Sequence, residues 1–191
     1  MNKSDNIIKN ALILFIVTVI AGVLLGFTFE MTVEPIKVQN EMQKTAAFKS
    51  IFSEGEFIPI ESELGEDQLI TSIYKVINEE VVDGYIFQVD TKEGYGGLVR
   101  LVIGLKSDGS VKAIEVIKHG ETPGLGAKID EDLFKNQFVD KLSSGFVVVK
   151  KTSVTDDEIQ AISGATISSK AVVVGVNAAL EFYENYKKEG E

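Results

Sequence analysis

The sequence predicts an α+β fold, an antiparallel sheet with packed helices, preceded by one N-terminal transmembrane helix. Three observations predict it: residues 11–29 carry no charge, runs rich in β-branched residues flank an Asp-Gly turn, and residues 168–188 carry a helical apolar stripe. Strands gathered around an antiparallel hairpin and interrupted by helices are typical of the α+β class. The 191 residues suffice for one domain of moderate size and an accessory element.

The uncharged stretch at residues 11–29 has the length of a membrane span. Its 19 residues reach about 28 Å at a helical rise of roughly 1.5 Å per residue, close to the ~30 Å hydrocarbon core of a bilayer. A secretory signal has a shorter apolar core followed by a small-residue cleavage site, and this stretch is longer and lacks a convincing site. The sequence therefore favours an uncleaved anchor.

The charges that flank this span predict its orientation. Lys3 and Lys9 precede it, whereas Glu30 and Glu34 follow it. Because positive charge is retained on the cytoplasmic side, we expect residues 1–10 in the cytoplasm. The chain is then a single-pass cell-membrane protein with its C-terminal domain outside.

A linker helix and loop are expected at residues 30–66. Residues 34–52 predict an amphipathic helix, and Pro35 suits its first turn. Residues 53–66 are rich in Glu, Gly and Ser, include a proline, and predict a loop. The extracytoplasmic domain then comprises residues 67–191.

Strands dominate the first half of this domain. Runs of β-branched and aromatic residues predict them, at residues 72–77, 84–89, 98–105 and 111–118. Between the last two, residues 106–110 have Asp-Gly at their centre and predict a hairpin turn. In the last strand we expect three inward-facing side chains, Val111, Ala113 and Val116.

The second half of the domain mixes helix and strand. We expect a short helix at residues 130–137, a strand at 146–149 and a long helix at 168–188. Basic residues in the last turn of that long helix fit a helix C-terminus. Its apolar stripe consists of Val172, Val176, Ala179, Phe182 and Tyr186.

Composition excludes several classes of function. The net charge of −10, without a basic stripe, argues against nucleic-acid partners. The chain has no cysteine, which excludes disulfides, iron–sulfur clusters and Cys-ligated zinc. Its single histidine, His119, argues against a His-based metal site or a Ser-His-Asp triad. We expect no metal site, and redox work by such a chain would need an organic cofactor.

Three Gly-rich segments stand out, at residues 94–97, 120–126 and 163–166. Glycine permits close backbone approach, but none of the three matches a P-loop or a G-x-G-x-x-G fingerprint. The third, Ser163-Gly164-Ala165-Thr166, precedes the long helix. Small and hydroxyl residues there form an ordinary capped turn, or a site where helix amides favour a phosphate.

Taken together and in this order, the segments resemble the FMN-binding domain family. The matching runs are Gly94-Tyr95-Gly96-Gly97-Leu98, residues 119–127 with the sequence HGETPGLGA, and residues 161–169 with the sequence AISGATISS. The resemblance covers roughly residues 84–186. Within the family the chain is similar to the G subunit of the Rnf electron-transport complex, whose length and single N-terminal span also fit.

The resemblance implies FMN joined through a phosphoester to Thr166. Gly164 and Ala165 leave room for a modifying enzyme, and the helix start favours the negative charge of a phosphodiester. The family implies a separate, Mg-dependent flavin transferase that takes FMN from FAD. The neighbouring hydroxyls that compete with Thr166 are Ser163, Ser168 and Ser169.

The 119–127 loop is expected beside the isoalloxazine ring. Thr122 would offer a hydroxyl, Leu125 an apolar face, and Gly124 and Gly126 backbone amides; the alternative is a rigid Pro-Gly turn without a ligand role. Lys170, one helical turn after Thr166, would neutralise the phosphate or would simply be solvated. Glu121 would repel a phosphate, and we do not assign it to the site.

Two residues of the matching runs leave questions open. His119 is either a structural hydrogen-bonding residue or a redox residue. The family pattern often has an aspartate just before the Ala-Ile-Ser stretch, where this chain has Gln160. This departure bears on how a transferase would recognise the site and leaves the acceptor hydroxyl unaffected.

The resemblance implies an electron-relay subunit without a catalytic acid, base or nucleophile of its own. It would belong to a membrane complex that runs between ferredoxin and NAD and transports sodium or protons, with the other membrane subunits as partners. One alternative is the equivalent C subunit of the sodium-translocating NADH:quinone reductase. Another is a membrane-anchored scaffold or binding module without flavin.

Overall fold

A computed structural model describes residues 3–60, 69–152 and 154–190. The chain divides into two compact units, residues 1–43 and 44–191. The described residues of the first unit all lie in the helix α1, which spans Lys3–Ile51. The last turns of α1, from residue 44 on, are part of the second unit. The helices expected at residues 11–29 and 34–52 are therefore one continuous helix.

Pro35 lies inside α1 rather than at a helix start. Proline removes one backbone hydrogen bond, and the residues on both sides nevertheless continue the helix. Among the described residues, α1 is the one helix long and apolar enough to cross a membrane, with a candidate span at Ile7–Ile51 and a mean hydropathy of 2.7 in its apolar window. The apolar stretch at residues 11–29 lies within that span.

The second unit is built on a five-stranded antiparallel sheet in the order β1-β2-β3-β4-β5. The strands are β1 (Glu56–Pro59), β2 (Ile70–Asn78), β3 (Val81–Gly94), β4 (Gly97–Lys106) and β5 (Val111–His119). The four predicted strands are confirmed and extended. The prediction of a loop over residues 53–66 is wrong for residues 56–59, which form β1 and pair with β2. Residues 61–66 of the predicted loop lie outside the described residues.

The inward face of β5 differs from the predicted alternation. Val111 and Val116 are buried as expected, but Ala113 lies on the opposite face, against the second core cluster. The cause is a register shift: Leu105 pairs with Val111 and Gly104 pairs with Ala113, so β5 has one extra residue between them. A bulge of this kind reverses the faces of the residues that follow it.

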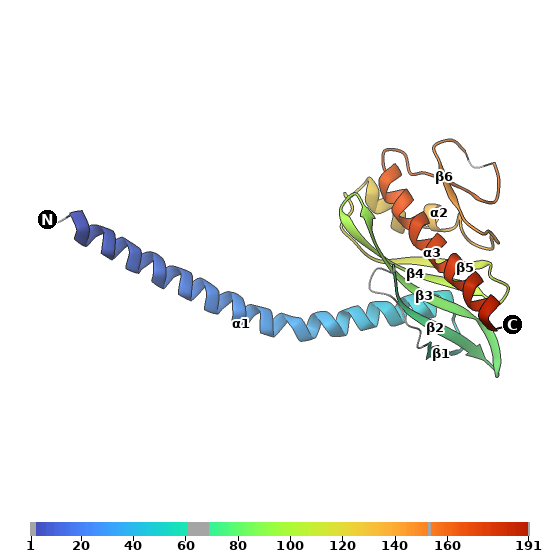
Figure 1. Cartoon of the computed structure of the whole chain (residues 1–191), viewed down its shortest axis with the longest axis horizontal. Coiled ribbons are helices and arrows are strands. Elements are labelled where there is room, and N and C mark those ends of the chain that lie inside the picture. The colour runs from blue at the N-terminus through green and yellow to red at the C-terminus, as the bar shows by residue number, and fades with distance from the viewer. Residues whose placement is uncertain (1–2, 61–68, 153, 191) are drawn as a thin grey trace. The chain divides into compact units, whose positions relative to one another are not determined.

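Both faces of the sheet are covered, as Figure 1 shows for α3, which crosses one of them. The helix α3 spans Thr166–Gly190 and packs with β3 and β4 in the larger core cluster. On the other face, the end of α1 packs in a second cluster formed by Ala47, Phe48, Ile51, Phe52, Val76, Ile86 and Val102. Apolar burial on both faces explains why the interior strand β4 is apolar almost throughout.

The remaining elements lie between β5 and α3. They are the 3-10 turn η1 (Gly126–Asp130), the helix α2 (Asp132–Lys135), and the two-stranded parallel pair of β6 (Val147–Val149) and β7 (Glu158–Gln160). The helix predicted at residues 130–137 is thus shorter. The strand β7 was missed because three residues carry no periodic signal and depend on a partner strand.

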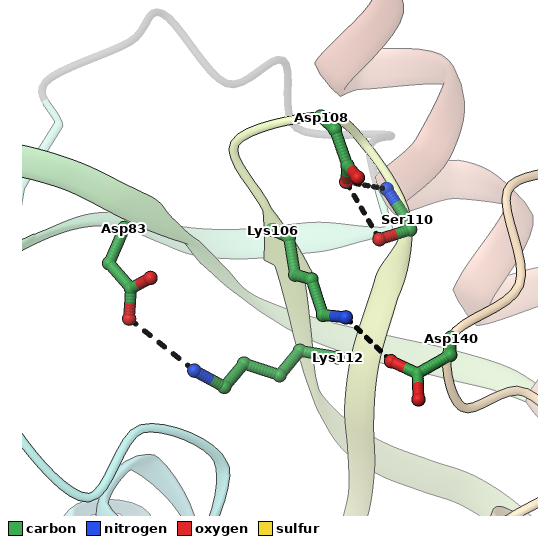
Figure 2. Close-up of polar contacts among 6 residues, drawn as sticks. All are labelled: Asp83, Lys106, Asp108, Ser110, Lys112 and Asp140. Carbon is green, nitrogen blue, oxygen red and sulfur yellow. Dashed lines mark hydrogen bonds and ion pairs between the residues drawn. The ribbon is translucent and has the colours of Figure 1, made fainter.

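Figure 2 shows the polar contacts at the β4–β5 turn, at the end of β4 away from the β3–β4 turn. The Asp108 carboxylate accepts hydrogen bonds from the Ser110 hydroxyl at 2.7 Å and its backbone N–H at 2.8 Å. These bonds hold the pKa of Asp108 below its usual value. The flanking ion pairs join Lys106 to Asp140 at 2.6 Å and Lys112 to Asp83 at 3.4 Å. The predicted Asp-Gly turn is confirmed.

Candidate functional site

The three Gly-rich segments meet at one end of the sheet. They are the β3–β4 turn, the loop that follows β5, and the loop between β7 and α3. The first two touch through their backbones, since a Cβ added to Gly96 would overlap the Gly120 carbonyl. The second and third touch at Leu125 and Gly164, where an added Cβ would lie 3.0 Å from Leu125 Cδ1. Segments far apart in sequence thus form one site.

A cavity of about 400 Å³ opens where these loops converge. This volume lies within the roughly 300–1,000 Å³ range of small-molecule sites. Its walls combine apolar side chains with glycine backbone and a few polar groups. The lining consists of Tyr95, Glu121, Thr122, Leu125, Gly126, Gly164, Ala165, Ile167 and Ser168.

Thr166 is the first residue of α3 and lies between two lining residues, Ala165 and Ile167. Its side chain is half-buried, and its hydroxyl makes no hydrogen bond within the described part of the chain. The helical backbone bonds begin with Ser169 N–H, which donates to the Ala165 carbonyl at 3.0 Å. The amides before it are at the helix end that attracts negative charge.

Burial separates Thr166 from two of its rivals. The Ser168 side chain is buried and donates to Glu121 Oε2 at 2.6 Å. Ser169 is also buried; its hydroxyl donates to the Ala165 carbonyl at 3.0 Å and accepts from the Ile162 N–H at 3.0 Å. Both hydroxyls are already engaged inside the fold.

Ser163 is the remaining rival, and its side chain is exposed. It lines a second cavity of about 400 Å³, formed with residues of α2 and β7, rather than the cavity beside Thr166. Ser163 and Thr166 are therefore the two candidate residues that are not buried. Thr166 is not itself among the lining residues, but its two chain neighbours, Ala165 and Ile167, both line the first cavity.

The other predicted site residues divide into two groups. The first group lines the cavity: Thr122, Leu125, Gly126, Gly164 and Ala165. Gly124 and Lys170 do not, and Lys170 is exposed on the first turns of α3. The expected contact of Lys170 with a phosphate stays a prediction.

The Pro-Gly turn expected as the alternative is also present, and two of its residues line the cavity. Leu125 N–H donates to the Thr122 carbonyl at 3.1 Å and closes the turn around Pro123 and Gly124, whose φ is +75°. The turn therefore holds Thr122 and Leu125 on the cavity wall.

Three lining residues were missed from the sequence. Tyr95 and Ile167 are large apolar side chains with exposed fractions of 72% and 52%, both at the cavity. An aromatic residue within a Gly-rich turn was the signal available for Tyr95. Glu121 was left out because of its charge, yet it is buried and lines the cavity.

His119 and Gln160 have structural contacts. His119 Nδ1 accepts a hydrogen bond from the Glu121 backbone N–H at 3.2 Å, which fits the structural alternative. The backbone of Gln160 is bonded in both directions by the side chain of Gln137: its N–H donates to Oε1 at 2.7 Å and its carbonyl accepts from Nε2 at 3.2 Å. The Gln160 side chain itself is exposed.

The cavity offers apolar surface and lies near a helix N-terminus, two features that a partly apolar ligand with a phosphate would use. Exposed Tyr95, Leu125 and Ile167 come from three different segments and offer apolar surface around the cavity. The start of α3 offers backbone amides and the positive end of its dipole to a phosphate. The half-buried Thr166 is the first residue of that helix and lies between two lining residues in the chain.

Comparison with known proteins shows the family to which the chain belongs. The family described as FMN-binding domain matches residues 94–181, and the RnfG N-terminal region matches residues 1–51. The G subunit of the Na(+)-translocating ferredoxin:NAD(+) oxidoreductase complex of Acetobacterium woodii is 35% identical over 196 residues, covering 95% of this chain and 94% of that protein. The G subunit of the proton-translocating ferredoxin:NAD(+) oxidoreductase complex of Clostridium ljungdahlii is 45% identical over 97 residues, 51% of each chain.

A solved structure shares the fold at lower identity. The C subunit of the Na(+)-translocating NADH-quinone reductase from Parabacteroides distasonis aligns with a TM-score of 0.57 and 22% identity, over 78% of this chain and 93% of that one. Identity at this level shows a common fold alone.

Proposed function

Because this chain belongs to the RnfG family, the G subunits of ion-translocating oxidoreductase complexes, and carries their FMN-binding domain, we propose that it is an electron-relay subunit with FMN attached to Thr166. The observation that carries the proposal is the position of Thr166. This half-buried residue is the first of α3, and its two chain neighbours line a cavity of about 400 Å³. Bound FMN supplies reversible uptake and release of electrons.

The residues of the cavity would bind and orient the cofactor. Leu125, Ile167 and Tyr95 would contact the ring system and exclude water from it. The first amides of α3 would hold the phosphodiester, which keeps one negative charge at the favourable end of the helix dipole. The turn closed by Thr122 and Leu125 would keep that wall rigid.

Attachment requires a group transfer from FAD. The Thr166 oxygen would bond to the phosphorus of the FMN portion while the pyrophosphate P–O bond to AMP breaks; the hydroxyl proton would go to a base of the transferase, and AMP would leave. This reaction needs an approach to the hydroxyl, and the exposed Ser163 and Gly164 leave that side of the loop open. The transferase is a separate protein, so the chain itself needs no catalytic base.

Flavin fluorescence in a denaturing gel tests the attachment. We expect the full-length chain, co-expressed with a flavin transferase, to give a fluorescent band, Thr166→Val to give none, and Ser163→Ala to match the wild type. Mass spectrometry of the tryptic peptide then locates the group. A dark wild-type band would contradict the flavoprotein proposal and favour the flavin-free scaffold, whereas a fluorescent Thr166→Val band would contradict only the attachment site.

The proposed complex is a membrane-bound ferredoxin:NAD oxidoreductase that transports sodium or protons, since the curated relatives carry both names. The domain after α1 would lie outside the cytoplasm, where a covalent bond prevents loss of the flavin. Affinity purification of the full-length chain should recover the other membrane subunits. Recovery of NADH:quinone reductase subunits instead would favour the alternative, the C subunit of that enzyme.

A further inference from the structure

One buried carboxylate connects all three loops of the cavity. Glu121 Oε1 accepts a hydrogen bond from the Gly96 N–H at 3.1 Å, and Oε2 accepts one from the Ser168 hydroxyl at 2.6 Å. Its own backbone N–H donates to His119 Nδ1 at 3.2 Å. The residue is only 5% exposed. Its side chain therefore ties the β3–β4 turn and the first turn of α3 to the loop after β5.

Two glycines leave the space that this carboxylate occupies. A Cβ added to Gly94 would lie 2.5 Å from Oε1, and a Cβ added to Gly126 would lie 2.5 Å from Oε2. Both distances are too short for real contacts. Glu121 is thus one of the groups that leave no room for a side chain at these two positions, together with the Gly97 carbonyl at Gly94 and the Ser168 hydroxyl at Gly126.

The charge of Glu121 has no cationic partner within the described part of the chain: none of the ion pairs there includes it. Two hydrogen bonds and the positive end of α3 are its compensation. The carboxylate lines the cavity together with the apolar Leu125 and Ile167. In such surroundings a charge acts more strongly than it does in water.

We propose that Glu121 lowers the reduction potential of the flavin in this cavity. A fixed negative charge beside the ring opposes the addition of electrons, so the oxidised form is favoured. Glu121 acts through its field and through the loops it holds, and it takes no part in bond making. The proposal rests on the proposed function, because it requires a flavin in the cavity.

Two substitutions change the electrostatic effect of this carboxylate on the flavin in opposite directions. Glu121→Gln keeps the size of the side chain and removes the charge, so we expect the midpoint potential to rise. Ser168→Ala removes one donor and leaves the carboxylate less compensated, so we expect the potential to fall. Glu184→Gln removes the same charge from an exposed position later in α3 and serves as the control.

The test is a spectroelectrochemical titration of the full-length, flavin-loaded protein in detergent. In the measured couple, FMN gains two electrons and takes up to two protons from water, while dithionite is oxidised to sulfite. We expect Glu121→Gln to shift the equilibrium at least tenfold toward the reduced form, about 30 mV for a two-electron couple. The control should leave it unchanged.

The outcomes separate this proposal from the one it rests on. A wild-type chain without covalent flavin would contradict the proposed function. A loaded Glu121→Gln protein with the wild-type potential would overturn the role of Glu121 alone. If Glu121→Gln does not load flavin, the Ser168→Ala protein decides: a lowered potential supports the proposal, and an unchanged one overturns it.

Discussion

Gly164 lies directly against Leu125, so that a Cβ on Gly164 would stand 3.0 Å from Leu125 Cδ1. Gly164 also has a φ of +78°, a conformation that side-chain-bearing residues rarely adopt. The contact fixes the loop before α3 against the loop after β5. Thr166 follows two residues later in the same chain segment.

Gly164→Ala is therefore expected to destabilise the loop in two ways. The left-handed conformation costs roughly 1–2 kcal/mol for a residue with a Cβ, and contact with Leu125 adds to it. In the double variant with Leu125→Ala, the contact is relieved and the conformational strain remains. Thermal unfolding of the detergent-solubilised chain, followed by near-ultraviolet circular dichroism, gives the four stabilities of this cycle. Strict additivity of the two substitutions would contradict the contact.

Gly96→Ala should separate two loops of the cavity. The added Cβ would overlap the Gly120 carbonyl, which is backbone and cannot rotate away. We expect a loss of about 1–3 kcal/mol in the free energy of unfolding and weaker flavin fluorescence in the gel. Gly145→Ala is the matched control, because its Cβ would meet no atom within 4 Å. Equal free energies of unfolding for the two variants would show that the two loops can move apart without loss of stability, which would contradict the prediction.

The absence of cysteine allows a direct test of membrane orientation. We expect a membrane-impermeant maleimide to label Glu184→Cys nearly completely in intact cells, because the domain after α1 is proposed to face outward. Lys9→Cys should be labelled only after the cells are lysed. The reverse pattern would place the flavin domain in the cytoplasm and remove the stated reason for a covalent bond.

The Asp108 carboxylate predicts a pH dependence of stability. Hydrogen bonds from Ser110 lower its pKa in the folded state below its ordinary value near 3.8. Its contribution is therefore complete above that value and is lost as pH falls through the lower, folded-state pKa. Because the group is exposed, Asp108→Asn should cost only about 0.5–1 kcal/mol at neutral pH.

That cost should disappear in acid, where the wild-type carboxyl is also protonated. Unfolding measured at neutral pH and well below pH 3.8 tests it, with Glu54→Gln as an exposed control. A cost that persists unchanged in acid would show that it does not arise from the carboxylate charge.

Long apolar and β-branched runs were enough to predict β2 to β5 and α3, because each of these elements has its own periodic pattern. β1 and β7 lack such a pattern, and each forms by pairing with a neighbouring strand. The wrong face of Ala113 has the same origin, since the extra residue in β5 is set by its pairing with β4. The local sequence pattern does not predict those parts of the backbone whose conformation is determined by pairing with another strand.

The sequence by itself determined the apolar N-terminal helix and the antiparallel sheet, whereas the choice of Thr166 among the hydroxyls rests on the resemblance to the family and stays a prediction. Only the tertiary structure decided which neighbours of Thr166 are accessible, because the burial of Ser168 and Ser169 depends on contacts with distant or backbone groups. The tertiary structure likewise brought Glu121 into the cavity. From the sequence, Glu121 was excluded because its charge would repel a phosphate. That argument did not include its hydrogen-bond donors, Gly96 and Ser168, which lie 25 and 47 residues away along the chain.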